Sequence, residues 1–468
     1  MKTACNFSYL LILSVIAALG GFLFGYDEAV ISGTISDVST QFHLDDFMVG
    51  WFVGSALLGA IVGVLCAGKL SDCMGRKRAM LISAVLFCIS MIGCAFSGDF
   101  VELVVFRIVG GMGIGVASIV CPLYISEISV PQHRGLLVSF YQLAITVGIV
   151  AAYLVNDRLL AYSHGGCELS GWLGLIFVSE VWRGMLGMGI VPSLLFLGLV
   201  MFVPESPRWL VSRGRENQAL AIFRKIYNSD EQAESQVKAT HAVCLNEKRS
   251  DFSSLFKPGI FKALMIGVSI AMLGQFMGVN AVLYYGPEIF KDAGLDSGDA
   301  LFYQVLVGVA NMLTTVAAMF IIDKVGRKKL IYWGVSGMIV SLLLIAFYFV
   351  YGAKLEISPV LLLVFFMAYI ICCAGSICAV VWVLLSEIYP TRVRGLAMSV
   401  AGFALWVGTF LVGQLTPVLL ASITPAGTFL LFAVMCVPYM LIMRFLVPET
   451  TGLSLEEIET LWMKKKNK

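Results

Sequence analysis

The sequence predicts an all-α membrane protein with twelve transmembrane helices arranged as two six-helix halves. Three observations support this prediction: the composition, the number of long apolar runs, and an internal repeat. Hydrophobic residues make up 59% of the 468 residues and charged residues only 13%, and the mean hydropathy is +0.90. Soluble domains carry about 25% charged residues. The composition therefore excludes disordered, collagen-like, coiled-coil and small secreted proteins.

Twelve apolar runs are long enough to cross a bilayer, which takes about 20 residues. They cover residues 8–33, 48–69, 79–98, 101–126, 136–157, 182–203, 260–285, 301–323, 329–351, 358–385, 396–420 and 424–447. No cleavage-site pattern follows the first run, so we interpret it as a span and not as a signal peptide. With both termini inside, 27 of the 32 Lys and Arg residues fall on the cytosolic side. This asymmetry follows the positive-inside rule and supports an even number of spans.

Three motif pairs recur in the same order. Asp72 to Lys77 (Asp-Cys-Met-Gly-Arg-Lys) follows span two, and Asp323 to Lys328 (Asp-Lys-Val-Gly-Arg-Lys) follows span eight. Ser-Glu followed by Arg-Gly comes after spans four and ten, and Val-Pro-Glu comes after spans six and twelve. We therefore expect an N-terminal half at 1–203, a cytosolic linker with short helices at 204–257, a C-terminal half at 258–450 and a cytosolic tail at 451–468. Parallel repeats of this kind are typical of major facilitator transporters.

The repeated cytosolic motifs have two interpretations. One is topology alone, because glycine permits a tight turn and basic residues lie at the headgroup level. The other, which we favour, is a latch of ion pairs where the halves meet, because acidic residues stand at matching places in both halves. The residues of this cytosolic latch are Asp72, Arg76, Glu127, Arg134, Asp323, Arg327, Glu387 and Arg394.

Two ionisable residues lie within apolar runs, Asp27 in span one and Arg107 in span four. A charge near the bilayer centre costs about 2.5–3.5 kcal/mol on insertion scales, so such residues normally face a cavity and pair. The alternative is that either residue lies near a helix end and its side chain reaches water. A pair accounts for both residues at once.

Span seven carries two amides and a tyrosine around a glycine. In an ideal helix Asn280 and Tyr284 lie about 40° apart, whereas Gln275 and Asn280 lie about 140° apart. Both amides can face one cavity only if the helix is locally unwound, which Gly278 would allow. Hydrogen bonds between helices are the alternative use of such amides.

Further candidate residues extend this set. Gln142 and Asn311 lie in spans five and eight, and Trp382 and Trp406 lie well inside spans ten and eleven. Amides exchange hydrogen bonds with hydroxyls and aromatic rings cover C–H faces, so the set suits a neutral polyol. Simple packing is the alternative for either tryptophan. Apart from Arg107, which Asp27 would neutralise, the spans offer no fixed cation for an acidic substrate.

The motifs together resemble the sugar porter family of the major facilitator superfamily over nearly the whole chain. Besides the repeats, the resemblance is carried by Pro204-Glu-Ser-Pro-Arg-Trp-Leu210, Asn280 to Tyr285 and Trp382 to Glu387. Residues 20–33 nearly match the opening Gly-Gly-Leu-Leu-Phe-Gly-Tyr-Asp-Thr-Ala-Val-Ile-Ser-Gly of bacterial D-xylose–proton symporters.

The resemblance implies a sugar site and a proton-coupling pair. Asp27 and Arg107 match the coupling aspartate and its arginine. The sugar-binding residues would be Phe24, Gln142, Gln275, Asn280, Tyr284, Asn311, Trp382 and Trp406. The chain departs from the family pattern at Gly274, where the family carries Gln, and at Cys378-Ala379, where it carries Gly-Pro. It also departs from the xylose symporters at Leu405 and Ile149, where these carry Gln. Specificity is therefore expected to differ from that for xylose, and span ten to be stiffer.

The expected function is proton-coupled symport of a monosaccharide, a pentose such as D-xylose or a hexose, by alternating access. The alternatives are a passive sugar facilitator and, less favoured, a transporter-like sugar receptor. Passive facilitators of the family tend to carry a neutral residue at the place of Asp27, so Asp27 favours symport. Transporter-like receptors usually need a long cytosolic tail, and the tail expected here is short. No metal or nucleophile constellation is present, so an enzyme is not expected. We expect no cofactor and no nucleic acid. The expected partners are a monosaccharide, a proton and the lipid bilayer, with a monomeric chain in a bacterial inner membrane and both termini cytosolic.

Overall fold

The computed structural model describes residues 5–165, 170–227, 229–246, 252–352, 354–389 and 393–447. Within these ranges the chain is almost entirely helical, and its only β pairing is an isolated bridge between Cys5 and Tyr227. The helices are α1 (Phe7–Val30), η1 (Ile31–Gly33), α2 (Ile35–Phe42), α3 (Asp46–Met74), α4 (Arg76–Phe96), α5 (Phe100–Ile128), α6 (Arg134–His164), α7 (Gly171–Gly174), η2 (Leu175–Ser179), α8 (Val181–Gly187), α9 (Ile190–Phe202), α10 (Pro207–Ser212), α11 (Glu216–Ile226), α12 (Asp230–Asn246), η3 (Phe252–Phe256), α13 (Pro258–Phe276), α14 (Val279–Asp292), α15 (Ser297–Val325), α16 (Arg327–Tyr351), α17 (Pro359–Cys373), η4 (Ala374–Cys378), α18 (Ala379–Ile388) and α19 (Arg394–Phe445).

Eleven helical stretches among the described residues are long and apolar enough to cross a membrane. The last of them, α19, has 52 residues and would be roughly 78 Å long at 1.5 Å per residue, far more than one crossing needs. Its backbone leaves the helical region at Thr424, where φ is 65° and ψ is 160°. The helix therefore breaks there, and α19 accounts for two of the twelve predicted spans.

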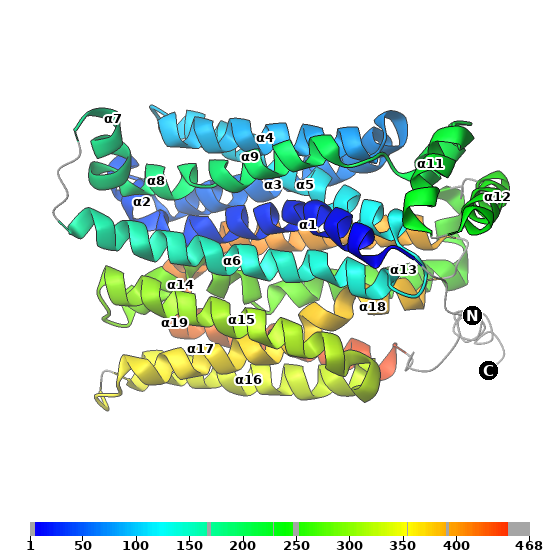
Figure 1. Ribbon diagram of the computed structural model, residues 1–468. Helices are drawn as coiled ribbons and strands as arrows, with labels where there is room; N and C mark the ends of the chain where they lie inside the picture. Colours follow the sequence, from blue (N-terminus) through cyan, green and yellow to red (C-terminus); the bar gives the residue numbers. More distant parts are fainter. Residues whose placement is uncertain are drawn as a thin grey trace. The chain divides into compact units, whose positions relative to one another are not determined.

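The contacts divide the chain into two compact units. Unit 1 consists of residues 1–30, 58–155 and 166–249, and unit 2 of residues 31–57, 156–165 and 250–468. Each unit contains long apolar helices, which Figure 1 colours by their position in the sequence. The segments 31–57 and 156–165 come from the N-terminal half of the sequence and nevertheless belong to unit 2.

In unit 1 the helices α4 and α5 pack on each other, and α1 packs on α5 and approaches α6 (Figure 1). A Cβ atom added at Gly25 of α1 would lie 1.9 Å from the carbonyl oxygen of Ile145 on α6. The two backbones therefore meet directly. The short helices α10, α11 and α12 contact one another in the polar interval that follows α9.

Unit 2 contains two interrupted helices that matter for the site. Span seven is formed by α13 and α14, with Gly278 between them in the left-handed region at φ 90°. Span ten is formed by α17, the π-helical turn η4 and α18. Alongside them, α16 and α17 lie side by side (Figure 1).

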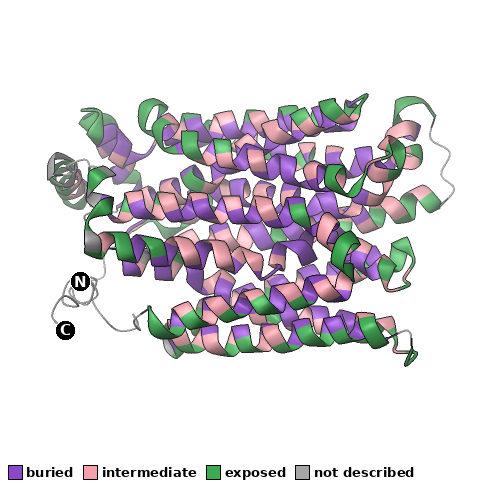
Figure 2. Cartoon of the chain, turned by 180° about the vertical axis from the view of Figure 1, so that it is seen from behind, coloured by how far each residue is buried: buried purple, intermediate pink, exposed green. Residues whose placement is uncertain are grey.

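The outward faces of the long helices carry large apolar side chains. Phe202 is 86% exposed, Trp333 81% and Val101 69%. Exposed positions recur along the lengths of the long helices in Figure 2. A few exposed apolar side chains are ordinary on soluble proteins, but large apolar side chains that recur on the outside of the long helices mark an interaction surface. Here that surface suits the hydrocarbon of a bilayer.

Candidate functional site

The buried ionisable pair lies inside unit 1. Asp27 on α1 and Arg107 on α5 are each only 3% exposed. They are close enough to interact electrostatically. A Cβ at Gly110, one helical turn after Arg107, would lie 3.9 Å from Asp27 Oδ1, so the carboxylate faces the Arg107 side of α5. The structure thus brings together the two residues that the sequence pairs.

The carboxylate of Asp27 is poorly satisfied. Its Oδ2 atom has no hydrogen-bond partner among the described residues. The neighbouring Tyr26 hydroxyl is not available, because it donates to the Met185 carbonyl at 3.2 Å. A buried carboxylate oxygen without a donor is costly, and protonation would relieve that cost. The arrangement is chemically suited to gaining and losing a proton.

Two predicted sugar-site residues also belong to unit 1, Phe24 on α1 and Gln142 on α6. Both are half-buried. The close approach of Gly25 to Ile145 places Phe24 and Gln142 on adjoining helices, because Gln142 is one turn from Ile145. The other six predicted sugar-site residues belong to unit 2.

The predicted unwinding of span seven is present. α13 ends at Phe276 and α14 begins at Val279, so the helix is interrupted between the two amides. Asn280 Nδ2 donates to Gln275 Oε1 at 2.8 Å, and Thr409 Oγ1 donates to the same oxygen at 3.1 Å. The break therefore brings both amides together, and in this structure they bond to each other and to α19.

The remaining unit 2 candidates differ in exposure. Tyr284 is 1% exposed, Trp406 6% and Asn311 9%, whereas Trp382 is 41% exposed. A Cβ at Gly402 on α19 would lie 3.5 Å from the Trp382 ring. Trp382 therefore lies against α19 and keeps part of its ring accessible, as a residue that contacts a ligand would. A role in sugar binding remains a prediction for all of them.

The charged motifs form dense ion pairs within unit 1. Arg76 Nε donates to Glu127 Oε2 at 3.0 Å, Arg76 Nη2 to Glu127 Oε1 at 3.0 Å, and Arg76 Nη1 to Asp72 Oδ1 at 3.1 Å. Arg76 is 9% exposed and the Glu127 side chain 3%, so this pair is shielded from water, whereas the Asp72 side chain is 72% exposed. A forked arginine–carboxylate pair of this kind is among the stronger charged hydrogen bonds.

Glu205 lies in the motif Pro204-Glu-Ser-Pro-Arg-Trp-Leu210, and the sequence alone gives no role for this residue. In the structure, Glu205 Oε1 accepts from the backbone N–H groups of Arg76 at 2.8 Å and Lys77 at 3.1 Å, at the start of α4. Ser206 Oγ donates to Glu127 Oε2 at 2.5 Å. The sequence feature that could have indicated this role is the glutamate of the repeated Val-Pro-Glu motif after span six. A carboxylate is favoured beside the N–H groups of the first turn of a helix.

Unit 2 repeats part of this pattern. Arg327 Nη2 donates to Glu387 Oε1 at 3.0 Å, with side chains 12% and 17% exposed. The side chain of Asp323 lies outside the described residues. Arg134 is exposed and Arg394 half-buried. Each ion pair named here joins residues of one unit, and the latch between halves remains a prediction.

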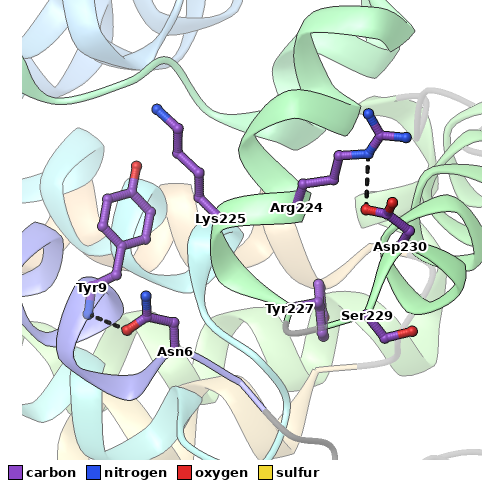
Figure 3. Close-up of a pocket in the computed structure, with 7 residues that line it drawn as sticks. All are labelled: Asn6, Tyr9, Arg224, Lys225, Tyr227, Ser229 and Asp230. Carbon is purple, nitrogen blue, oxygen red and sulfur yellow. Dashed lines mark hydrogen bonds and ion pairs between the residues drawn. The ribbon is translucent and has the colours of Figure 1, made fainter.

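A polar hollow of about 650 Å³ lies elsewhere in unit 1 (Figure 3). It is lined by Asn6, Tyr9, Arg224, Lys225, Tyr227, Ser229 and Asp230. Arg224 pairs with Asp230 at 3.1 Å, and Asn6 N donates to the Ile226 carbonyl at 2.8 Å. The start of α1 is thereby attached to α11. None of the predicted sugar-site residues lines this hollow.

The fold and the buried charges define a multi-pass membrane carrier, and comparison with known proteins specifies which kind. The family model described as "Sugar (and other) transporter" matches residues 13–462. The arabinose–proton symporter of Bacillus subtilis (strain 168) is 39% identical, over 98% of this chain and 96% of that protein. The D-xylose–proton symporter of Escherichia coli (strain K12) is 36% identical, over 99% of this chain and 97% of that protein.

Solved structures agree. The inward-open conformation of the E. coli xylose transporter XylE matches with a TM-score of 0.83 at 34% identity, over 97% of this chain and all of that one. The same transporter bound to 6-bromo-6-deoxy-D-glucose matches with a TM-score of 0.79 at 36% identity, over 98% of this chain and 100% of that one. The chain belongs to the sugar transporter family of the major facilitator superfamily, and it is a transporter and not an enzyme.

Proposed function

We propose that this protein is a monosaccharide–proton symporter that works by alternating access. The observation that carries the proposal is the buried pair of Asp27 and Arg107 within unit 1. A sugar site alone needs no carboxylate in a membrane span, and a buried charge there is costly. The relatives named above as arabinose–proton and D-xylose–proton symporters support the same activity.

The coupling follows from charge. When Asp27 takes up a proton, a buried negative charge disappears and the attraction to Arg107 weakens. The loaded carrier can then change conformation at lower cost, and the proton leaves on the other side. One proton moving through 100 mV yields about 2.3 kcal/mol, which supports a sugar gradient of roughly 50-fold. Coupling to one proton is therefore sufficient for accumulation.

The substrate class follows from the uncharged polar residues. Gln275, Asn280 and Thr409 already exchange hydrogen bonds at the break in span seven, and sugar hydroxyls can take the place of these partners. We assign a neutral pentose or hexose as the substrate. We further infer that the protein lies as a monomer in a bacterial inner membrane. Both termini are cytosolic in this proposal, an orientation that the charge asymmetry of the loops supports.

The test is transport by purified protein in proteoliposomes. Labelled L-arabinose, D-xylose and D-glucose are offered with and without an imposed pH gradient, and the external pH is recorded. The wild type should accumulate at least one of these sugars only when the gradient is present, and sugar addition should make the medium more alkaline. Asp27→Asn mimics the protonated acid permanently. It should still bind and exchange sugar but lose accumulation and alkalinisation.

Glu234→Gln is the matched control, because Glu234 is an exposed carboxylate on α12. It should behave as wild type in every arm. Sugar-driven alkalinisation that persists in Asp27→Asn would falsify the coupling assignment. Sugar exchange by the wild type without any response to the pH gradient would identify a passive facilitator instead.

A further inference from the structure

Span ten of this chain contains a π-helical turn bounded by two cysteines. α17 ends at Cys373, the π turn η4 runs from Ala374 to Cys378, and α18 starts at Ala379. The Sγ atoms of Cys373 and Cys378 lie 3.8 Å apart. Both residues belong to unit 2.

The π turn explains why these two thiols meet. Residues five apart are separated by about 140° around an α-helix, so their side chains point in different directions. A π turn is wider and bonds residue i to residue i+5, which brings these positions onto the same face. Cys372, one residue earlier, points elsewhere. A Cβ at Gly337 on α16 would lie 2.5 Å from its Sγ, so Cys372 faces α16.

The two thiols differ in access. Cys373 is 1% exposed, whereas Cys378 is half-buried. A reagent can therefore react first at Cys378 and then close onto Cys373. No group of three or more His, Cys, Asp or Glu residues suited to a metal ion occurs among the described residues. The pair thus lacks the further ligands of a structural zinc site, and a bifunctional reagent that needs only two thiols fits it.

We propose that Cys373 and Cys378 form a dithiol binding site for trivalent arsenicals, and that occupation of this site blocks transport. An arsenoxide, R–As=O, condenses with the two thiols. Two As–S bonds form, both S–H bonds and the As–O bond break, and the oxygen leaves as water with the two thiol protons. The oxidation state of arsenic does not change, so no oxidant or reductant is required.

The proposed block follows from what lies on either side of the π turn. Trp382, a predicted sugar residue, follows Cys378 by one helical turn on α18. On the other side of η4, the Tyr369 hydroxyl of α17 donates to the Met277 carbonyl at 2.7 Å, at the break in span seven. A bridge from Cys373 to Cys378 fixes the winding of the π turn between Tyr369 and Trp382. Transport that needs this segment to change its winding would stop, a consequence that rests on the proposed function.

The experiment uses reduced, purified full-length protein and phenylarsine oxide as the probe. Intact-protein mass spectrometry counts bound arsenical, and proteoliposomes report the initial rate of sugar uptake. The variants are Cys373→Ser and Cys378→Ser. The matched controls are Cys372→Ser, the neighbouring thiol on the same helix, and Cys436→Ser, a buried thiol on α19. Thermal unfolding and size-exclusion profiles confirm that each variant is folded.

Wild type and both controls should bind one arsenical per chain and lose uptake by about ten-fold or more, because a locked conformational step limits turnover. A dithiol such as 2,3-dimercaptopropanol should restore uptake, whereas a monothiol should not. Cys373→Ser and Cys378→Ser should show neither the adduct nor the inhibition. An adduct that is absent in wild type, or present in Cys378→Ser, overturns the site.

An adduct with unchanged uptake overturns the block. The mass measurement does not depend on transport. A chain that forms the adduct but moves none of the tested sugars would count against the proposed function and leave the dithiol site supported.

Discussion

Gln275 lies one residue before the end of α13 and uses its side-chain oxygen twice. That oxygen accepts from Asn280 at 2.8 Å and from Thr409 at 3.1 Å, which ties α13 to α14 and α19. These bonds hold the plane of the amide in this structure, and its N–H groups are donors that an acceptor can use. The residue therefore has a structural role, and its role in sugar binding remains a prediction.

Replacing Gln275 with alanine should weaken sugar binding by about 1–3 kcal/mol, the cost of leaving buried polar groups unpaired. Gln142→Ala and Trp382→Ala should act on the same scale, the latter through a lost aromatic contact. Isothermal titration calorimetry of the purified protein measures the effect. Gln218→Ala, an exposed amide on α11, is the control. Intact affinity in all three variants would place the sugar site elsewhere.

Asp37 is a charged residue for which no sequence motif indicates a role. It lies on α2, between the first two spans, and belongs to unit 2. Burial raises the pKa of its carboxyl, Lys291 lowers this pKa, Glu288 raises it and His164 lowers it, with burial the largest effect. The folded protein therefore holds the Asp37 proton more tightly than the unfolded chain does.

The sign of the pH dependence follows from this direction. Protonated Asp37 stabilises the fold, and that stabilisation is lost as the pH rises from about 4, near the unfolded value, through the raised pKa of the folded state. Asp37→Asn should remove this component, so its unfolding temperature should vary less across that interval. Thermal unfolding in detergent at a series of pH values tests it, with Glu234→Gln as the control. Identical pH profiles for wild type and Asp37→Asn would contradict the assignment.

At the scale of elements, the break in span seven depends on one glycine. Gly278 has a φ angle of 90°, which residues other than glycine adopt only with strain. A Cβ there would also lie 2.4 Å from the Phe432 ring on α19. Two independent requirements therefore select glycine at this position.

Gly278→Ala should destabilise the protein by about 1–2 kcal/mol from backbone strain alone, with a further cost from the displaced Phe432 ring. It should also weaken sugar binding, because the two amides lose their alignment. Thermal unfolding and calorimetry report the two effects separately. Gly298→Ala on α15 is the matched control, since a Cβ there meets nothing within 4 Å. Equal sugar affinities of the two variants would show that the break at Gly278 is not part of the binding site.

The elements that the sequence predicts well are those set by long periodic signals. Twelve apolar runs predict the spans. The angle between Gln275 and Asn280 predicts a break at Gly278 on the condition that both amides face one cavity, because in an unbroken helix they point in different directions. The π turn of span ten is different. The absence of a proline at Cys378-Ala379 predicts a stiffer helix, which stays a prediction, but it does not predict a π turn. The altered winding of η4 depends on packing between helices, which no local pattern contains.

The same limit applies to the site. Asp27 and Arg107 could be paired from the sequence because an ionisable residue in a span needs a partner. Asp37 could not be found, because α2 is a short polar segment and only its tertiary contacts bury it. The role of Glu205 also required the structure, since its partners are backbone N–H groups 128 and 129 residues away.

At the scale of the whole molecule, the internal repeat extends to individual hydrogen bonds. Gly75 and Gly326 have φ values of 96° and 94° at equivalent turns. Lys77 Nζ donates to the Met201 carbonyl at 2.7 Å in unit 1, and Lys328 Nζ donates to the Val447 carbonyl at 2.9 Å in unit 2. The repeated lysine thus anchors the end of the sixth span in each half. The motif therefore has a local structural role besides any role between halves.

Glu387→Gln tests whether the motif also acts between halves. If the cytosolic latch exists, loss of this carboxylate weakens the outward-facing state and shifts the protein toward the inward-facing one. Single cysteines in a cysteine-free background, placed on each face, should then label faster on the cytosolic face and more slowly outside. Arg134→Ala should produce the same shift. Unchanged labelling on both faces would leave only topology and the local pairing of Glu387 with Arg327.

The division into compact units has a consequence for cutting the chain. Residues 31–57 and 156–165 belong to unit 2, and within that unit Gln414 Nε2 donates to the Phe47 carbonyl at 3.0 Å. A break in the polar interval after α9 would separate these segments from the rest of their unit. A fragment starting at α13 would thus lack part of its own core, so unit 2 can be completed only when the N-terminal fragment supplies residues 31–57 and 156–165.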